Sequence, residues 1–166
     1  MKNIVLTTIA AVVLVGCGES QQSAPAPEPT TAKAPDISIH KAVESGNIKA
    51  VKQHLDAGTD VNAKDADGFT SLHYAARWGF KNIAELLITE GANVNAKNNY
   101  KETPLQYAAN IDDREIVKLL ITKGANVNTI NGNGQTPLEM SLGSEMADLL
   151  RKHGGKTAEE LKAEGK

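Results

Sequence analysis

Apolar and polar positions recur with a period of 33 residues from position 36 onward. Residues 68–97 and 101–130 align without a gap. A fixed period of about 20 to 50 residues marks an array of stacked units, each of which buries an apolar face against its neighbours. The matched positions are Ile39, Leu72, Leu105 and Leu138; Ala42, Ala75 and Ala108; and Gly58, Gly91 and Gly124.

Each unit predicts two short helices and a turn. Thr103 and Thr136 each place a hydroxyl before a proline, the order typical of a helix start. The second helix, over residues 82–90, is apolar around too much of its circumference for a surface helix, so it needs neighbours on two sides. On the first helix, small and apolar residues share a face that admits a close neighbour: Leu72, Ala75, Ala76 and Gly79.

Residues 70–76 read Thr-Ser-Leu-His-Tyr-Ala-Ala, and residues 91–95 read Gly-Ala-Asn-Val-Asn. This pattern resembles the ankyrin repeat, whose family pattern is T-P-L-H-x-A-A, a glycine, a leucine-rich second helix and G-A-D-V-N. The resemblance covers about residues 36–155 and implies an all-α solenoid of about four helix-turn-helix units with projecting β-turns or hairpins. The implied units span about 36–68, 69–101, 102–134 and 135–155, and residues 156–166 are expected to form a C-terminal capping helix or tail.

Two residues stand where the neighbouring units have glycine. Asp112 occupies the loop between the first and second helices, and aspartate tolerates the left-handed region better than most residues. Lys101 occupies the tip of the middle turn. A left-handed conformation is strained for lysine, so the middle turn is expected to differ in shape from its neighbours.

The N-terminal segment predicts export. A lysine at position 2 precedes residues 4–15, which are apolar apart from two threonines, so residues 1–16 are typical of a secretory signal peptide. Residues 14–17, Leu-Val-Gly-Cys, resemble the lipobox of bacterial lipoproteins. The resemblance implies cleavage before Cys17 and a lipid on its sulfur. An ordinary signal peptide followed by a chance cysteine is the alternative.

Residues 17–35 hold Cys17 and four of the six prolines, with too little apolar surface to fold. Residues 19–35 predict a stiff tether whose reach, at about 3.1 Å per residue, is at most roughly 50 Å. Gly18 follows the cysteine, whereas an aspartate there favours inner-membrane retention in the lipoprotein family. The resemblance therefore implies an outer-membrane lipoprotein facing the periplasm, with the inner membrane or the cell surface as alternatives.

Composition argues against several kinds of chemistry. Cys17 is the only cysteine, so the folded part has neither a disulfide nor a thiolate metal site, and the formal charge of −2 does not favour nucleic acid. No glycine-rich phosphate loop or serine nucleophile motif is present. The four histidines share no recurring ligand pattern and are interpreted as structural: His40, His54, His73 and His153. We expect no enzyme activity, cofactor or metal.

The aromatic residues indicate a binding surface. All six lie between positions 69 and 107, and Tyr74, Arg77 and Trp78 share a helix face other than the predicted core face. Trp, Tyr and Arg are the residues that most often anchor interfaces. The expected partner site also includes Phe69, Tyr100, Asn110 and Ile111. The alternative is that these side chains cover edges within the solenoid.

The sequence therefore predicts a monomeric, non-catalytic protein–protein interaction module, tethered to the membrane through Cys17 and binding a protein partner through its concave face and turn tips. One alternative is an accessory domain that docks on a periplasmic enzyme and protects or stabilises it. A secreted, host-directed binder is another. A small-ligand or catalytic protein would require a deep pocket with converging polar groups.

Overall fold

The computed structural model describes residues 33–165, and within them the chain is helical with no strand. The expectation of an all-α repeat solenoid is confirmed. The predicted signal peptide, Cys17 and most of the proline-rich segment fall within residues 1–32, outside the described residues. The helices are α1 (Ile39–Glu44), α2 (Ile48–Asp56), α3 (Ser71–Arg77), α4 (Lys81–Thr89), α5 (Pro104–Asn110), α6 (Arg114–Thr122), α7 (Pro137–Met140), α8 (Ser144–Lys152) and α9 (Ala158–Ala163).

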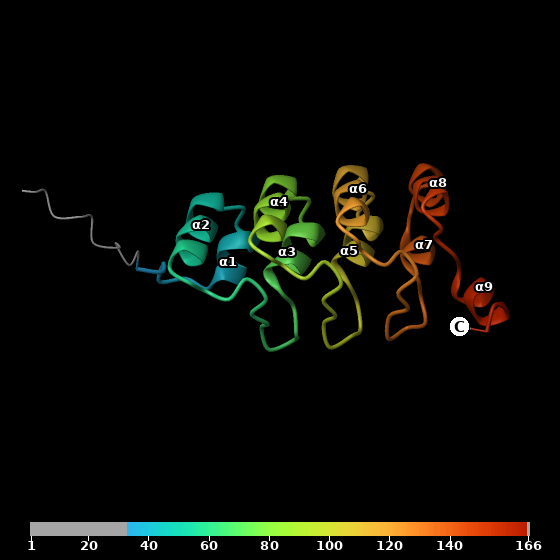
Figure 1. Ribbon diagram of the computed structural model, residues 1–166, viewed down its shortest axis with the longest axis horizontal. Coiled ribbons are helices and arrows are strands. Elements are labelled where there is room, and N and C mark those ends of the chain that lie inside the picture. The colour runs from blue at the N-terminus through green and yellow to red at the C-terminus, as the bar shows by residue number, and fades with distance from the viewer. Residues whose placement is uncertain (1–32, 166) are drawn as a thin grey trace, which may run out of the picture. The chain divides into compact units, whose positions relative to one another are not determined.

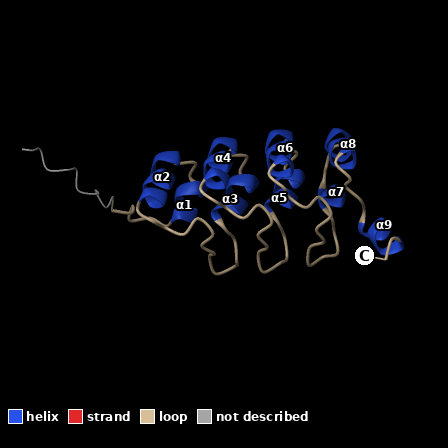
Figure 2. Ribbon diagram, viewed as in Figure 1, coloured by secondary structure: helices blue, strands red, loops and turns tan. Residues whose placement is uncertain are grey.

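The helices form antiparallel pairs that stack along the chain (Figures 1 and 2). Helices α1, α3, α5 and α7 contact one another in order, and α2, α4 and α6 form a second row. Long turns project from the stack between successive pairs (Figure 1). Among the described residues, hairpin character is limited to one isolated antiparallel bridge between Lys64 and Thr70.

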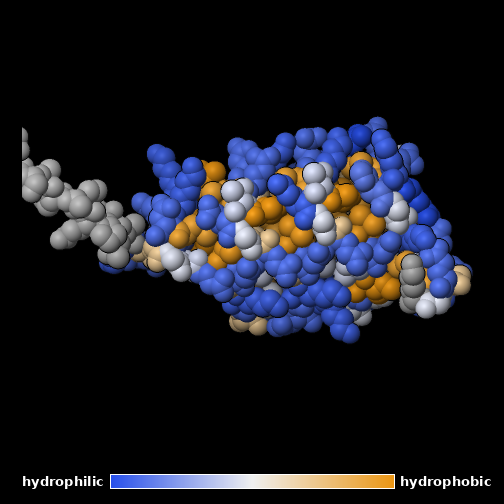
Figure 3. All heavy atoms as spheres, viewed as in Figure 1, coloured by the Kyte–Doolittle hydropathy of each residue, from blue (hydrophilic) through white to orange (hydrophobic). Residues whose placement is uncertain are grey.

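One apolar core runs through the stack. The small residues of the first-helix face are fully buried, including Leu72, Ala75 and Ala76. The second helices add larger side chains, among them Leu87 and Leu120, which are also fully buried. Figure 3 shows that apolar surface extends along the row of units between hydrophilic helices and hydrophilic turns. Each unit therefore covers its neighbour's apolar face, as the wide second-helix stripe predicts.

The starts of α3, α5 and α7 are each joined to the following element by one side chain, whereas His40 at the start of α1 bonds the Ala63 carbonyl of its own unit. In the second unit, Nδ1 of His73 accepts a hydrogen bond from the Thr70 amide at 3.1 Å. Its Nε2 lies 3.1 Å from the Glu102 carbonyl oxygen in the next turn, to which it donates. The tautomer follows from these two partners, because an N–H group cannot accept and a carbonyl cannot donate.

The same position changes chemistry from unit to unit. Gln106 accepts from the Thr103 amide at 3.0 Å and donates to the Gln135 carbonyl at 2.9 Å, as His73 does one unit earlier. In the last unit, Glu139 accepts from the Thr136 amide and from the Ala158 amide at 3.1 Å. The donor becomes an acceptor because the neighbour is now the start of α9, which offers N–H groups instead of a carbonyl.

Asparagines form a second set of bridges between units. Asn62 donates to the Gly91 carbonyl at 3.1 Å and accepts from the Asn93 amide at 2.8 Å. Asn95 and Asn128 repeat the arrangement with the following loops, at 3.0 Å to the carbonyls of Gly124 and Gly154. These bridges satisfy backbone groups that the helix ends leave unpaired.

The middle turn does not differ in conformation from its neighbours at its tip. Lys101 has a φ of 61°, in the left-handed region where Gly68 and Gly134 have a φ of 79°. The expectation of a different turn shape is therefore corrected: the lysine accepts the strained conformation. Hydrogen bonds between adjacent turns explain this, since the Asn99 amide donates to the Asp67 carbonyl and the Gly132 amide to the Tyr100 carbonyl. Asp112, with a φ of 60°, is left-handed as expected.

Because Lys101 is strained and glycine would not be, Lys101→Gly should raise the free energy of unfolding by up to about 1 kcal/mol. Glycine also gives the unfolded chain more conformational entropy, which reduces this gain. Gly134→Lys is the matched control, since no atom lies within 4 Å of the added Cβ and strain alone is introduced. It should lower stability. Urea unfolding measures both, and a loss of stability in the Lys101→Gly variant would contradict the strain.

His73 predicts acid sensitivity. Burial lowers the pKa of this histidine from 6.5 to about 4, although its hydrogen bond to the Glu102 carbonyl opposes the shift. The unfolded chain therefore binds the proton first, and stability is lost as the pH falls from about 6.5 to 4, by an amount on the order of 3 kcal/mol. His73→Gln should flatten this profile, because Gln106 makes the same bonds without titrating. Exposed His153→Gln is the control; an unchanged slope in His73→Gln refutes the assignment.

Candidate functional site

The end of α3 places two side chains on the surface. Because Leu72, Ala75 and Ala76 face the core, Arg77 and the C-cap residue Trp78 point outward. Trp78, the chain's single tryptophan, is 48 % exposed, which is high for so large an apolar side chain. The predicted exposure of this residue is confirmed, and the tryptophan is not one of the side chains buried between units.

The Arg77 guanidinium lies near two aromatic rings. Its guanidinium carbon is 5.6 Å from the centroid of the Trp78 ring and 6.0 Å from that of the Tyr107 ring. Tyr107 belongs to α5, so this cluster joins two neighbouring units. We call Arg77, Trp78 and Tyr107 the arginine–aromatic site. A cation over an aromatic face is attracted by the ring quadrupole, which holds the guanidinium in place.

The tyrosines near this site are tied to the projecting turns. The Tyr74 hydroxyl donates to Asp65 at 2.7 Å, and the Tyr107 hydroxyl donates to Glu102. Burial raises the pKa of Tyr74 to about 12, with a further contribution from the Asp65 carboxylate. Burial and the hydrogen bond to Glu102 also raise the pKa of Tyr107 above its ordinary value. Both hydroxyls are therefore neutral donors with a structural partner at neutral pH.

Asp65 also organises the first turn from within. One carboxylate oxygen accepts from the amides of Asp67 and Phe69 at 3.0 and 2.9 Å. Burial would raise the pKa of this carboxyl, but the hydrogen bonds from Tyr74 and these amides outweigh it and lower the pKa. The Asn98 side-chain oxygen accepts from two amides of the second turn in the same way.

Phe69 differs from its expected place. It is only 7 % exposed, and its ring centroid lies 5.5 Å from that of Tyr74 and 5.6 Å from those of His73 and Tyr107. This corrects the expectation that Phe69 contributes directly to the partner surface, because its ring is used to pack one turn against two first helices. Tyr74 is half-buried and has the same structural character.

The remaining predicted residues are exposed at different places. Ile111, 40 % exposed, ends α5, and its Cδ1 lies 3.8 Å from the position a Cβ on Gly79 would take, beside Trp78. Asn110 is exposed at the preceding position. Tyr100 is 56 % exposed on the second turn and, within residues 33–165, makes no ring contact with the arginine–aromatic site. The structure thus brings Arg77 and Trp78 together and places Ile111 against Gly79, the residue after Trp78, whereas Tyr100 lies on a turn.

The sequence analysis missed one residue of this site and one exposed apolar residue of the last unit. Tyr107 supports Arg77 from the next unit, and its position 33 residues after Tyr74 was the available signal. Leu142, 79 % exposed, lies in the connection between α7 and α8. The shortened last unit shifts Leu142 out of the repeat register, so no periodic signal identified it.

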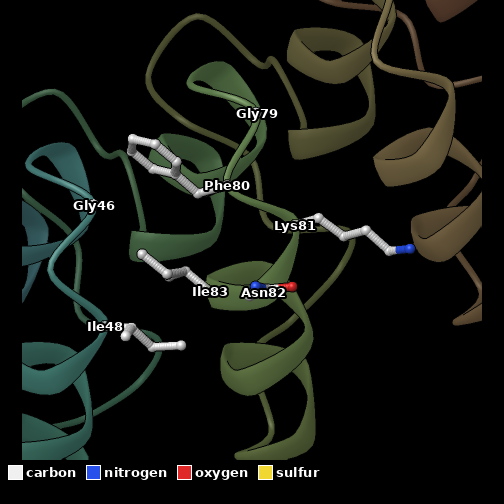
Figure 4. Close-up of a pocket in the computed structure, with 7 residues that line it drawn as sticks. All are labelled: Gly46, Ile48, Gly79, Phe80, Lys81, Asn82 and Ile83. Carbon is white, nitrogen blue, oxygen red and sulfur yellow. The ribbon is translucent and has the colours of Figure 1, made fainter.

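A separate cleft of about 320 Å³ lies between the first two units. Figure 4 shows the Phe80 ring directed toward Gly46, with Ile48 and Ile83 below it and the Lys81 side chain directed away. The Lys81 ammonium pairs with Glu85 and Glu115. Apart from Lys81, the side chains that line the cleft are those of Phe80, Ile48 and Ile83 and one polar group, Asn82, so it does not offer the set of converging polar groups that orients a small ligand.

Two other kinds of site are absent from residues 33–165. No group of three or more His, Cys, Asp or Glu side chains is placed to hold a metal ion there. No helix between residues 33 and 165 has the length and apolar character needed to cross a membrane.

Stacked helix pairs with projecting turns define a helical repeat protein. The family model for ankyrin repeats, in three copies, matches residues 39–131 and 97–160. The chain belongs to the ankyrin-repeat family. Ankyrin repeats mediate protein–protein interaction, and the family is generally non-catalytic.

Similar proteins share short stretches with this chain. Ankyrin repeat protein FPV223 of Fowlpox virus (strain NVSL) is 42% identical over 52 residues, covering 31% of this chain and 37% of the viral protein. Protein phosphatase 1 regulatory subunit 27 of Mus musculus is 41% identical over 51 residues, 31% of this chain and 33% of the subunit. Regulatory subunit 12A of Mus musculus is 40% identical over 57 residues, 34% of this chain but 6% of that subunit. The chain spans little more than a third of these relatives at most.

Because Phe69 is buried and Trp78 is half-exposed, replacing them with alanine should have different effects on stability. Phe69→Ala should lower the free energy of unfolding by roughly 3 kcal/mol, because it leaves a cavity among packed rings. Trp78→Ala should cost about 1 kcal/mol or less, because half of the side chain is already in water. Urea denaturation of the two variants is the measurement, and an equal or larger loss for Trp78→Ala would contradict the placement.

Proposed function

We propose that this chain is a non-catalytic protein-binding module, held by a lipid on Cys17 in the bacterial cell envelope, which binds its partner at the arginine–aromatic site and Ile111. The observation that carries the proposal is the half-exposed Trp78 with the Arg77 guanidinium over its ring, on a surface formed by two units. Trp and Arg near the centre of a rigid surface are the residues most enriched at binding hot spots.

The stacked fold suits this role. Arg77 and Tyr107 come from neighbouring units, so hydrogen bonds and packing between the units set the geometry before a partner arrives. A surface formed in advance loses little conformational entropy on binding. A large aromatic ring left half in water on a stable scaffold is consistent with later burial by another protein.

The sequence supports the tether. Residues 14–17 match the lipobox pattern, and the proline-rich residues that follow reach at most roughly 50 Å at about 3.1 Å per residue. Gly18 favours the outer membrane with the domain in the periplasm. In this arrangement the tether holds the ankyrin domain clear of the lipid surface, where the exposed site meets soluble or membrane-bound proteins.

A second candidate is a regulatory or protective subunit of a periplasmic enzyme. The names of two relatives favour it, since they are regulatory subunits of protein phosphatase 1. The shared physical basis is an ankyrin surface that docks on a separate protein. Enzyme activity that co-purifies with the chain and changes when Trp78 is replaced would support this candidate over a pure scaffold.

Crosslinking in intact bacteria tests the proposal. A photoreactive amino acid at Trp78 in the full chain should capture a discrete protein, whereas the same amino acid at exposed Lys118 on α6 should not. Cys17→Ser should block lipid labelling and processing, and should reduce capture if the partner is at the membrane. Normal processing and membrane partitioning of Cys17→Ser refutes the lipoprotein assignment, and no capture specific to position 78 refutes the site.

A further inference from the structure

We infer that the arginine–aromatic site receives a carboxylate side chain from an acidic, apolar-flanked segment of the partner protein. The inference rests on the proposed function and adds the chemistry of what is bound. It follows from the different surroundings of the chain's three arginines, from the charges beside Arg77 and from the apolar residues around it.

Two of the arginines already have a carboxylate. Arg114 is paired with Glu145, and both guanidinium bonds of Arg151 at 2.7 and 2.8 Å go to Glu160. Within residues 33–165, no ion pair or hydrogen bond is made by the Arg77 guanidinium. Arg77 is exposed, and its guanidinium carbon lies over the Trp78 and Tyr107 rings, whose π faces accept no conventional hydrogen bond, so its five N–H donors have no acceptor in this part of the protein.

The neighbouring acidic groups are occupied by other donors. Asp65 accepts from Tyr74 and from two turn amides, and Glu102 accepts from Tyr107 and Asn98. Glu44 is paired with Lys41. These carboxylates reduce the local positive charge without binding the guanidinium, so the donor edge of Arg77 remains available for a partner's carboxylate.

Arginine is suited to this task. Its planar fork matches a carboxylate with two parallel hydrogen bonds, and stacking on aromatic faces fixes the fork in advance. The chain carries a formal charge of −2, and the site has a single arginine. One fixed cation on a slightly acidic protein favours a single carboxylate over a polyanion such as nucleic acid, which needs several phosphate contacts.

The apolar flank defines the rest of the ligand. Trp78 and Ile111 lie at equivalent ends of successive first helices, and Leu142 follows in the next connection. Each of these three connections thus has one exposed apolar side chain. A partner segment that crosses neighbouring units meets apolar surface on the side of the site nearest Ile111. The segment is therefore expected to carry Asp or Glu next to an aliphatic or aromatic residue.

The test is selection from a library of random dodecapeptides on the immobilised full chain in detergent, followed by titration of selected peptides. Trp78 is the only tryptophan, so its fluorescence reports binding at this site directly. We expect enrichment of Asp or Glu beside an apolar residue, and a change in Trp78 fluorescence. Arg77→Gln should weaken the binding of these peptides by about tenfold or more. Replacing the peptide's Asp or Glu with Asn or Gln should have the same effect.

Arg114→Gln is the matched control, because it removes an arginine that is already paired on the outer helix, and it should leave the affinity unchanged. Arg77→Lys should recover only part of the affinity if two parallel bonds are made. Peptides that alter Trp78 fluorescence but lack a carboxylate, or bind Arg77→Gln equally well, overturn the inference and leave the proposed function standing. Failure to select any peptide that alters Trp78 fluorescence counts against both.

Discussion

Contact between neighbouring units is the constraint on which the rest of this structure depends. A single helix pair cannot bury its own apolar face or satisfy the carbonyls and amides at its helix ends. His73, Gln106 and Glu139 each link their own helix start to the next unit, and the asparagines at positions 62, 95 and 128 link the loops. Removing a neighbour therefore exposes apolar surface and leaves buried polar groups without partners.

The same constraint explains the C-terminal end. A solenoid needs a terminal element with a polar outer face, and α9 supplies it. Glu139 accepts from the start of this helix, while Arg151 pairs with Glu160 on its surface. The hydrogen bonds from Arg151 and the Thr157 amide lower the pKa of Glu160 to about 2, so this link is ionised at neutral pH. Helix α9 is thus held by Glu139, at the position that His73 and Gln106 use in earlier units to bond the following repeat.

The repeat pattern was sufficient to predict the stack. Thr103-Pro104 and Thr136-Pro137 mark helix starts that the structure shows, and the Thr157–Glu160 capping box is formed. The candidate surface was predicted less completely, because a helix face defined by spacing does not say which turn folds over it. Phe69 is covered by rings from two first helices, and Tyr107 lies under Arg77 only because adjacent units stack. At Lys101, bonds between turns override the preference of one residue.

We expect neighbouring units to form one cooperative body, so that Arg77 and Tyr107 are held together before any partner binds. Native-state hydrogen exchange of the full chain tests it at the Asn93 and Asn126 amides, which donate to Asn62 and Asn95 of the preceding unit. If the units are cooperative, both amides exchange with the same opening free energy, equal to that of global unfolding. A much lower opening free energy at Asn126 than at Asn93 would show that the unit carrying Tyr107 opens by itself, which would contradict a preformed site.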